Sequence, residues 1–234
     1  REAGLLAMRD NHDTITHKDL MMAYDRISIG ALSREKYTKE SIRATAYHES
    51  GHALITYILH PSSEIIKATI RPRKGALGYI WNRPIEELAS NSPNRELWMI
   101  EVQIALGGYV AEKIMLGSTS SGVGGGPGSD FYRAMSIASR MVWNLGMGKT
   151  GIIGDFSAIH NGQMSEKTRE ILDADTQEIL QTSLAKTTEL LTKHKDLLGF
   201  FAEELIAKGD LEYDEIVAIF DKFGLKSASR PEKV

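Results

Sequence analysis

The stretch His48-Glu49-Ser50-Gly51-His52 decides how the rest of this sequence is interpreted. On a helix, residues four positions apart share a face, so His48 and His52 are able to bind one metal ion through their imidazoles. Glu49 then lies beside the metal, where its carboxylate can take a proton from a metal-activated water. The pattern is typical of the catalytic core of a zinc peptidase.

The residues around this motif predict a helix over about 39–59. Thr38 or Ser41 is suited to the N-cap, and Pro61 ends the pattern. Gly51 costs about 1 kcal/mol relative to alanine inside a helix, so its presence indicates that another backbone or a substrate packs closely there. Buried polar groups are costly unless they are paired or metal-bound, and apolar residues surround the two histidines and the glutamate: Ile42, Ala46, Ala53, Leu54, Tyr57 and Ile58.

A catalytic zinc site needs a third protein ligand. The metzincin pattern would require glycine at position 55 and histidine at position 58, and both are isoleucine. A glutamate from a following helix, Glu101 or Glu112, would serve. Asp130 is an equal candidate, because it follows a glycine-rich loop and opens a helical pattern, where the helix dipole favours a carboxylate. The residue pattern alone leaves this choice open.

Composition limits the possible functions. The chain has 234 residues, of which 42% are hydrophobic, which is enough for a sizeable core and one or two domains. A net charge of −3 does not suggest a nucleic-acid or anionic-membrane partner. The absence of cysteine excludes disulfides, thiolate metal ligands and cysteine nucleophiles. No apolar run approaches the roughly 20 residues of a membrane span, and no signal peptide is evident.

The remaining pattern predicts a mainly α fold with a small β element. Two strand-like runs, Glu64–Ile70 and Leu77–Trp81, indicate a hairpin. Such a hairpin would either pair with an extended substrate at its edge or be purely structural, and the two readings are equally favoured. Helices are predicted as two short segments within 1–28, from Ser92-Pro93 to Leu116, and over about 130–145, 165–193, 195–208 and 212–223, the last capped by Asp210.

Two glycine-rich segments carry further expectations. Gly107-Gly108, in the middle of the helix that ends at Leu116, indicates tight packing, with the motif helix as the candidate neighbour. The loop 122–128 lacks the spacing of a phosphate-binding loop and is expected to be a flexible loop over the active site. Because Arg1 already lies in a helical pattern, we expect the chain to be a fragment or a processed product.

Four segments, which follow one another in the order found in the family, resemble the protease domain of the FtsH family, the membrane-anchored AAA+ zinc proteases of bacteria, mitochondria and chloroplasts. Residues 1–28 are similar to the last helices of the ATPase module of that family, and the resemblance covers about residues 1–225. The four segments are Thr45–Leu54 (TAYHESGHAL), Ile70–Tyr79 (IRPRKGALGY), Ala105–Glu112 (ALGGYVAE), and Ser129-Asp130-Phe131 followed by Ala134 and Met141-Val142.

The resemblance implies roles for individual residues. Glu49 corresponds to the catalytic base, and Asp130 to the third zinc ligand beside His48 and His52, so that Glu112 becomes a supporting residue. The implied cofactor is Zn²⁺, and ATP would act only through an ATPase module absent from these residues. The implied domains are the end of an AAA+ lid at 1–28, a metallopeptidase domain at 29–225 with a helical part at about 165–225, and a disordered tail at 226–234.

The resemblance also implies partners and location. The substrates would be unfolded or misassembled polypeptides, including membrane proteins, which an ATPase ring threads into a homohexameric protease ring. The chain would be a soluble domain of a membrane-anchored protein, at the cytoplasmic face of a bacterial inner membrane or in an inner compartment of mitochondria or chloroplasts. Contact with the membrane would come only from a missing N-terminal segment, and no nucleic acid is involved.

The sequence departs from the family pattern at a few positions. Ser50 replaces alanine, and Ser129 replaces asparagine. Tyr109 replaces arginine, which puts one contact between helices or subunits in doubt, and the loop 122–128 is longer than usual. No departure affects the proposed ligands or the base, so we expect an active enzyme.

Two other functions fit parts of the pattern. A non-catalytic ring-assembly scaffold with a vestigial metal site would show a broken motif, whereas this motif is intact. A di-iron carboxylate bundle needs two Glu-x-x-His pairs, and the sequence holds only Glu49 with His52. The pattern therefore favours a zinc endopeptidase.

Overall fold

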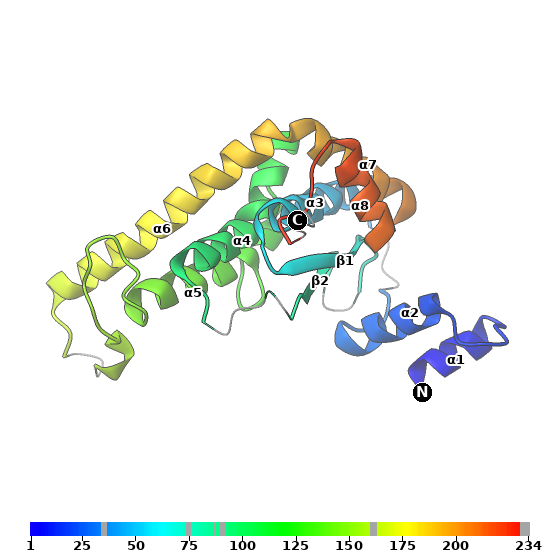
Figure 1. Cartoon of the computed structure of the whole chain (residues 1–234), viewed down its shortest axis with the longest axis horizontal. Coiled ribbons are helices and arrows are strands. Elements are labelled where there is room, and N and C mark those ends of the chain that lie inside the picture. The colour runs from blue at the N-terminus through cyan, green and yellow to red at the C-terminus, as the bar shows by residue number, and fades with distance from the viewer. Residues whose placement is uncertain (34–36, 74–75, 87, 89–91, 160–162, 230–234) are drawn as a thin grey trace.

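The computed structural model describes residues 1–33, 37–73, 76–86, 88, 92–159 and 163–229, and its described part is mainly helical with a small sheet (Figure 1). Among these residues, no helix has the length and apolar character needed to cross a membrane. The elements are α1 (Glu2–Arg9), α2 (His17–Ser28), α3 (Lys39–Leu59), β1 (Ser63–Thr69), β2 (Tyr79–Pro84), α4 (Arg95–Leu116), α5 (Asp130–Trp143), α6 (Glu166–Lys193), α7 (Lys195–Lys208), β3 (Asp210–Glu212) and α8 (Tyr213–Lys222).

The motif helix α3 crosses α4 at a contact between glycines. A Cβ atom built on Gly51 would lie 2.2 Å from the carbonyl oxygen of Gly107, and one built on Gly108 would lie 2.5 Å from the His48 ring. Real Cβ atoms do not approach so closely, so the two backbones meet only because these positions lack side chains. This confirms the prediction that the glycines of both helices mark close packing.

The predicted hairpin is present, and its first strand has a neighbour that the sequence did not reveal. Within the described residues the sheet order is β2-β1-β3, with both pairs antiparallel. Asp210, expected as a helix cap, instead lies in β3. The N-cap of α8 is Glu212, whose backbone N–H donates to Oε2 of Glu215 at 3.0 Å. A strand of three residues is too short to show a period, which explains the wrong assignment. β2 lies at an edge of the sheet.

The predicted start of α4 also differs from the structure. The N-cap of α4 is Asn94, whose side chain accepts the backbone N–H of Leu97 at 2.9 Å, so the helix begins later than Ser92-Pro93. In the segment expected to be a disordered tail, the backbone N–H of Ala228 donates to the carbonyl of Tyr57 at 3.0 Å, and the disorder of 226–234 stays a prediction. Residues 230–234 lie outside the described residues.

The C-terminal helices close the core over α3. Phe220 of α8 is fully buried and stacks on Tyr57 of α3, with ring centroids 3.6 Å apart. Phe201 of α7 is equally buried and packs against the same phenylalanine. A second cluster joins α4, α5 and α6 around Met141 and Leu172. The motif helix is therefore held between the sheet, α4 and the C-terminal helices.

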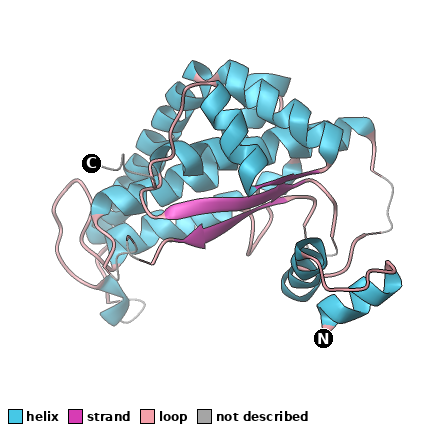
Figure 2. Cartoon of the chain, turned by 45° about the vertical axis from the view of Figure 1, so that its right-hand side comes forward, coloured by secondary structure: helices cyan, strands magenta, loops and turns pink. Residues whose placement is uncertain are grey.

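The N-terminal helices α1 and α2 form a pair that stands beside this body (Figures 1 and 2). Thr16 starts α2 through a capping box with Asp19, which accepts the backbone N–H of Thr16 at 2.8 Å. Ala3, Leu6 and Ala23 form a small apolar cluster between the two helices. That cluster is separate from the core around α3, and a domain boundary near residue 28 remains a prediction.

Candidate metal centre

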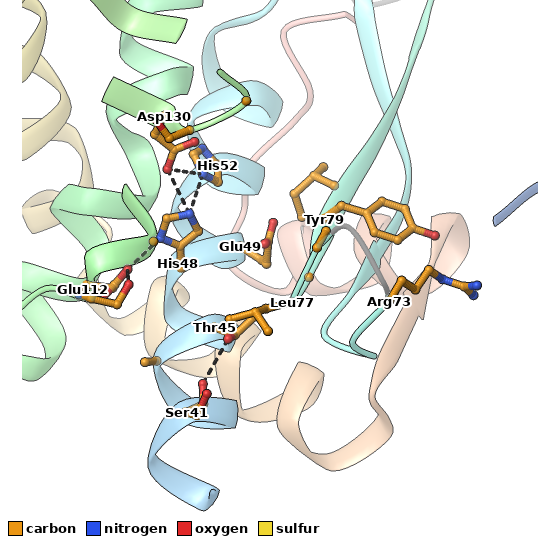
Figure 3. A pocket seen from close by; sticks show the side chains of 18 of the residues that line it. Ser41, Thr45, His48, Glu49, His52, Arg73, Leu77, Tyr79, Glu112 and Asp130 are labelled. Atoms are coloured by element: carbon orange, nitrogen blue, oxygen red, sulfur yellow. Dashed lines mark hydrogen bonds and ion pairs between the residues drawn. The ribbon is translucent and has the colours of Figure 1, made fainter. Parts of the chain in front are cut away.

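Three predicted ligands meet in one place (Figure 3). His48 and His52 project from α3, and Asp130 is the first residue of α5. The Nε2 atoms of the histidines are 3.1 Å apart, and Oδ2 of Asp130 lies 2.9 Å from Nε2 of His48 and 3.3 Å from Nε2 of His52. These side chains form the one cluster in the described part of the chain whose geometry suits a metal ion.

Each histidine is oriented from behind by an acceptor on α4. Nδ1 of His48 is 2.7 Å from Oε1 of Glu112, and Nδ1 of His52 is 2.7 Å from the carbonyl oxygen of Ile104. Both contacts favour a proton on Nδ1, which leaves Nε2 to face the centre of the site. Glu112 is 1% exposed and accepts the backbone N–H of Ser120 at 2.6 Å and its hydroxyl at 3.0 Å.

The distances between the ligand atoms fit a small cation. Bonds of about 2.0–2.2 Å in tetrahedral directions place neighbouring ligand atoms roughly 3.3 Å apart, close to the observed 2.9–3.3 Å. Oδ2 of Asp130 is buried without a well-formed hydrogen bond among the described residues. An acceptor left in this way, next to two imidazole nitrogens, is suited to ligation, and the residues present therefore fit zinc.

The pKa shifts of the side chains in the centre also favour a bound cation. Burial lowers the pKa of His48, but the carboxylates of Asp130 and Glu112 outweigh burial and raise that pKa to about 10. Burial raises the pKa of Asp130, yet its contacts with His48 and His52 dominate and hold that pKa well below the usual range. The carboxylates of Asp130 and Glu112 thus favour a positive charge between them, and a bound cation would supply this charge in place of a proton on His48.

Glu49 lies beside the three candidate ligands at the floor of a cleft. It is 7% exposed, and Figure 3 shows it between the histidines and the segment that carries Leu77 and Tyr79. Burial raises the pKa of its carboxyl group, against the opposing effects of His52 and His48. A cation held by the ligands would lower this pKa, because an opposite charge favours the carboxylate.

The cleft has a volume of about 950 Å³ and runs between α3 and the sheet edge. Its lining includes Tyr79, Ile80 and Asn82 of β2, together with Gly122 and Gly128 of the glycine-rich loop. The loop therefore borders the site, as its position in the sequence indicated. Within the described residues β2 pairs with β1 alone, so its other edge is available to an extended chain in the cleft.

The other ligand candidates have different partners. Glu101 lies outside the site, where it contacts Nε2 of His60 at 3.1 Å and Nη2 of Arg133 at 2.6 Å. Glu112 touches His48 from the side away from Asp130. Sequence reasoning missed Ser120 and the carbonyl of Ile104. A backbone acceptor leaves no mark in the sequence, and Ser120 lies in an irregular segment without a period.

The positions that depart from the expected pattern fit the structure without disturbing the site. The hydroxyl of Ser50 is buried and donates to the carbonyl of Ala46 at 2.6 Å. Ser129 precedes α5, and its hydroxyl donates to the carbonyl of Gly126 at 2.8 Å. The ring of Tyr109 packs on Phe131, with centroids 5.0 Å apart, next to Asp130.

Comparisons with known proteins agree with this geometry. The model of a family described as peptidase family M41 matches residues 35–219. A protein named ATP-dependent zinc metalloprotease FtsH from Borreliella burgdorferi is 34% identical over 92% of this chain and 35% of its own length. FtsH 4 of Sorangium cellulosum is 32% identical over 93% of the chain, and FtsH 3 of Conexibacter woesei 32% over all of it, covering 35% and 31% of those proteins. The chain thus spans about a third of the length of these relatives.

Proposed function

This chain belongs to peptidase family M41, and from that membership we propose that it is the zinc endopeptidase domain of an FtsH-type protease. The observation that carries the proposal is the meeting of His48, His52 and Asp130 in a cleft with Glu49 beside them. Residues 1–28 are proposed as the end of an ATPase lid, and residues 29–225 as the peptidase domain.

We assign His48, His52 and Asp130 as the zinc ligands. Two imidazoles and one carboxylate are a typical set for a catalytic zinc, which keeps a further position open. When bound, zinc supplies Lewis acidity that makes a water more acidic and polarises the carbonyl of the scissile peptide bond. Glu112 fixes the ring of His48, and the carbonyl of Ile104 fixes that of His52.

Glu49 is assigned as the general base. Its carboxylate accepts a proton from the water that attacks the peptide carbonyl, and it then delivers this proton to the departing amine nitrogen. This role requires an ionised carboxylate. Burial raises the pKa of Glu49, and a cation held by the neighbouring ligands would lower that pKa and favour the carboxylate. The two histidines and Asp130 therefore bind the zinc ion, and Glu49 transfers the proton.

The substrate is proposed to be an unfolded or flexible polypeptide. An extended chain in the cleft pairs with the free edge of β2, so that its carbonyl groups pass over Glu49. A folded protein does not offer such an extended segment. We further propose that ATP-driven unfolding belongs to the whole protein, because the relatives are named ATP-dependent zinc metalloproteases. A homohexameric ring and membrane attachment, at a bacterial inner membrane or in an organelle, are proposed from the family resemblance alone.

Replacement of the base tests this function. Glu49→Gln should lower the rate of casein cleavage by about 10²–10⁴-fold, because general base catalysis is lost. Its zinc content should stay that of the unchanged protein, because Glu49 is not a ligand. Glu96→Gln, an exposed carboxylate in the first turn of α4, is the matched control and should behave as wild type.

Two results would contradict the proposal. If Glu49→Gln cleaved casein at the wild-type rate, Glu49 would not be the base. A wild-type protein that bound zinc but cleaved no unfolded substrate would instead favour a non-catalytic ring-assembly module.

A further inference from the structure

A buried carboxylate on α2 joins the N-terminal helix pair to the sheet. Asp25 is 1% exposed, and it accepts hydrogen bonds from Nζ of Lys67 at 3.2 Å, from Nη2 of Arg73 at 2.8 Å and from the hydroxyl of Tyr79. Lys67 belongs to β1, Tyr79 begins β2, and Arg73 lies between these strands. A charge so deeply buried is tolerated only with such partners. The zinc chemistry proposed above uses none of them.

Arg73 and Tyr79 are the two ends of the segment that leads into β2. The backbone N–H of Arg73 donates to the carbonyl of Ala76 at 2.7 Å, and the N–H of Ala76 donates back at 3.2 Å. Nη1 of Arg73 also donates to the carbonyl of Gly30 at 2.9 Å, just beyond α2. Tyr79 pairs with Thr69 of β1. Asp25 therefore holds Arg73 before this segment's described residues 76–78, and Tyr79 after them.

Gly78, one residue before Tyr79, lies against the catalytic carboxylate. A Cβ atom built on Gly78 would lie 2.9 Å from both Cγ and Oε1 of Glu49, and 2.7 Å from the carbonyl oxygen of Thr69. The backbone of Gly78 thus forms one wall around Glu49. In Figure 3 the side chains of Arg73 and Tyr79 point away from Glu49. A displacement of either end would change the space around Glu49.

A second contact between α2 and β2 reinforces the first. Tyr24, next to Asp25 on α2, stacks on Trp81 of β2, with ring centroids 4.3 Å apart and an interplanar angle of 18°. Trp81 follows Tyr79 by two positions, so both side chains lie on the same face of β2. The helix α2 therefore contacts β2 through two adjacent residues, Asp25 by hydrogen bonding and Tyr24 by aromatic stacking.

We propose that Asp25 is a positioning residue of the peptidase: by holding Arg73 and Tyr79 it keeps the backbone of Gly78 against Glu49. The placement of the helix pair α1–α2 thereby sets the geometry of the catalytic carboxylate and of the cleft edge of β2. The effect on catalysis rests on the proposed function of Glu49, whereas the effect on β2 does not.

The test compares Asp25→Asn with Asp19→Asn in the full chain. Both carboxylates are buried on α2, but the contacts of Asp19 are with Thr16 and His12, at the start of that helix. Lys67 keeps Glu212 at 3.5 Å when Asp25 is replaced, which limits the damage to the fold. A second pair is Tyr79→Phe against Tyr213→Phe, since the hydroxyl of Tyr213 donates to Glu64 at 3.1 Å and not to Asp25.

Hydrogen–deuterium exchange in EDTA is measured first, because it depends on neither zinc nor cleavage. Asp25→Asn should increase the exchange of residues 76–82 by about tenfold or more and leave α6 unchanged, whereas Asp19→Asn should affect residues 1–28 alone. With zinc restored, kcat/KM for casein should fall about tenfold or more, because both the catalytic carboxylate and the edge of β2 that pairs with substrate are displaced. Tyr79→Phe should show both effects more weakly, and Asp25→Glu should recover part of each.

The outcomes separate this inference from the function on which it builds. Equal exchange of residues 76–82 in Asp25→Asn and Asp19→Asn would overturn the positioning role. Loss of protection throughout the chain, α6 included, would also overturn it, since Asp25 would then be a general stability residue. If exchange changed as expected but no variant and no wild-type protein cleaved casein, the proposed function would fail while the contact between α2 and β2 stood.

Discussion

At the scale of single residues, His48 is the most tightly constrained group of the centre. Its Nδ1 atom meets Glu112, and its Nε2 atom faces Asp130 and His52. Glu112 is in turn held by the backbone N–H and the hydroxyl of Ser120. The ring therefore has one orientation available, and that orientation depends on a carboxylate that does not itself face the metal position.

Removal of this support should weaken zinc binding without removing a ligand. Glu112→Ala is expected to lower zinc affinity by about 10–100-fold, because the ring of His48 loses its partner. Ser120→Ala should have a smaller effect, since its backbone N–H still donates to Oε2 of Glu112. Competition with a chromophoric chelator measures both affinities. Unchanged affinity in Glu112→Ala, or an equal loss in Ser120→Ala, would contradict the role given to Glu112.

The sequence predicted the side chains of the centre better than their surroundings. His48, Glu49 and His52 follow from one motif, because a helix places residues four apart on one face. Asp130 came from family resemblance, since the pattern alone left Glu101 and Glu112 equally open. The structure separates the three by their partners, and it adds the carbonyl of Ile104, which no side-chain pattern could have indicated.

At the scale of elements, the crossing of α3 and α4 determines whether the centre forms at all. Gly51 faces Gly107 so closely that no side chain fits between the two backbones. Gly108 leaves room for the ring of His48, which reaches Glu112 across the same crossing. The helix that carries both histidines and the helix that orients them therefore meet through their glycines.

A methyl group added at this crossing should destabilise the fold far more than one added elsewhere in a helix. Gly51→Ala should reduce the free energy of unfolding by at least about 2 kcal/mol, because the added Cβ forces the helices apart. Gly199→Ala on α7 is the control, since its Cβ would meet only the flexible end of Met115 at 3.4 Å, and it should stabilise by up to about 1 kcal/mol. Chemical denaturation measures both values. Similar stability changes in the two variants would refute the close crossing.

The elements themselves were largely predictable, and the exceptions have physical causes. The motif helix and the hairpin follow from apolar periodicity and from Thr38 and Pro61 as helix signals. The strand β3 and the start of α4 at Arg95 were missed, because β3 is too short for a pattern and several residues near Ser92 suit a helix cap. Which helices pack together was indicated only by the glycines.

At the scale of the whole molecule, the candidate centre exists because distant segments are folded together. The histidines come from α3 and the carboxylate from the start of α5, and α4 packs against both helices. The C-terminal helices close the core behind α3, where Phe220 stacks on Tyr57. Sequence patterns define each helix but not this packing, so the meeting of Asp130 with the histidines could not be derived from the pattern.

Zinc content is the measurement that tests the central claim most directly. Purified wild-type protein and Asp130→Ala are compared by elemental analysis, with Asp173→Ala, an exposed carboxylate on α6, as the matched control. Circular dichroism confirms that all three proteins fold. We predict about one zinc ion per chain in the wild type and in Asp173→Ala, and a sharp loss in Asp130→Ala. Folded Asp130→Ala protein that kept its full zinc content would contradict the assignment of His48, His52 and Asp130 as the metal site.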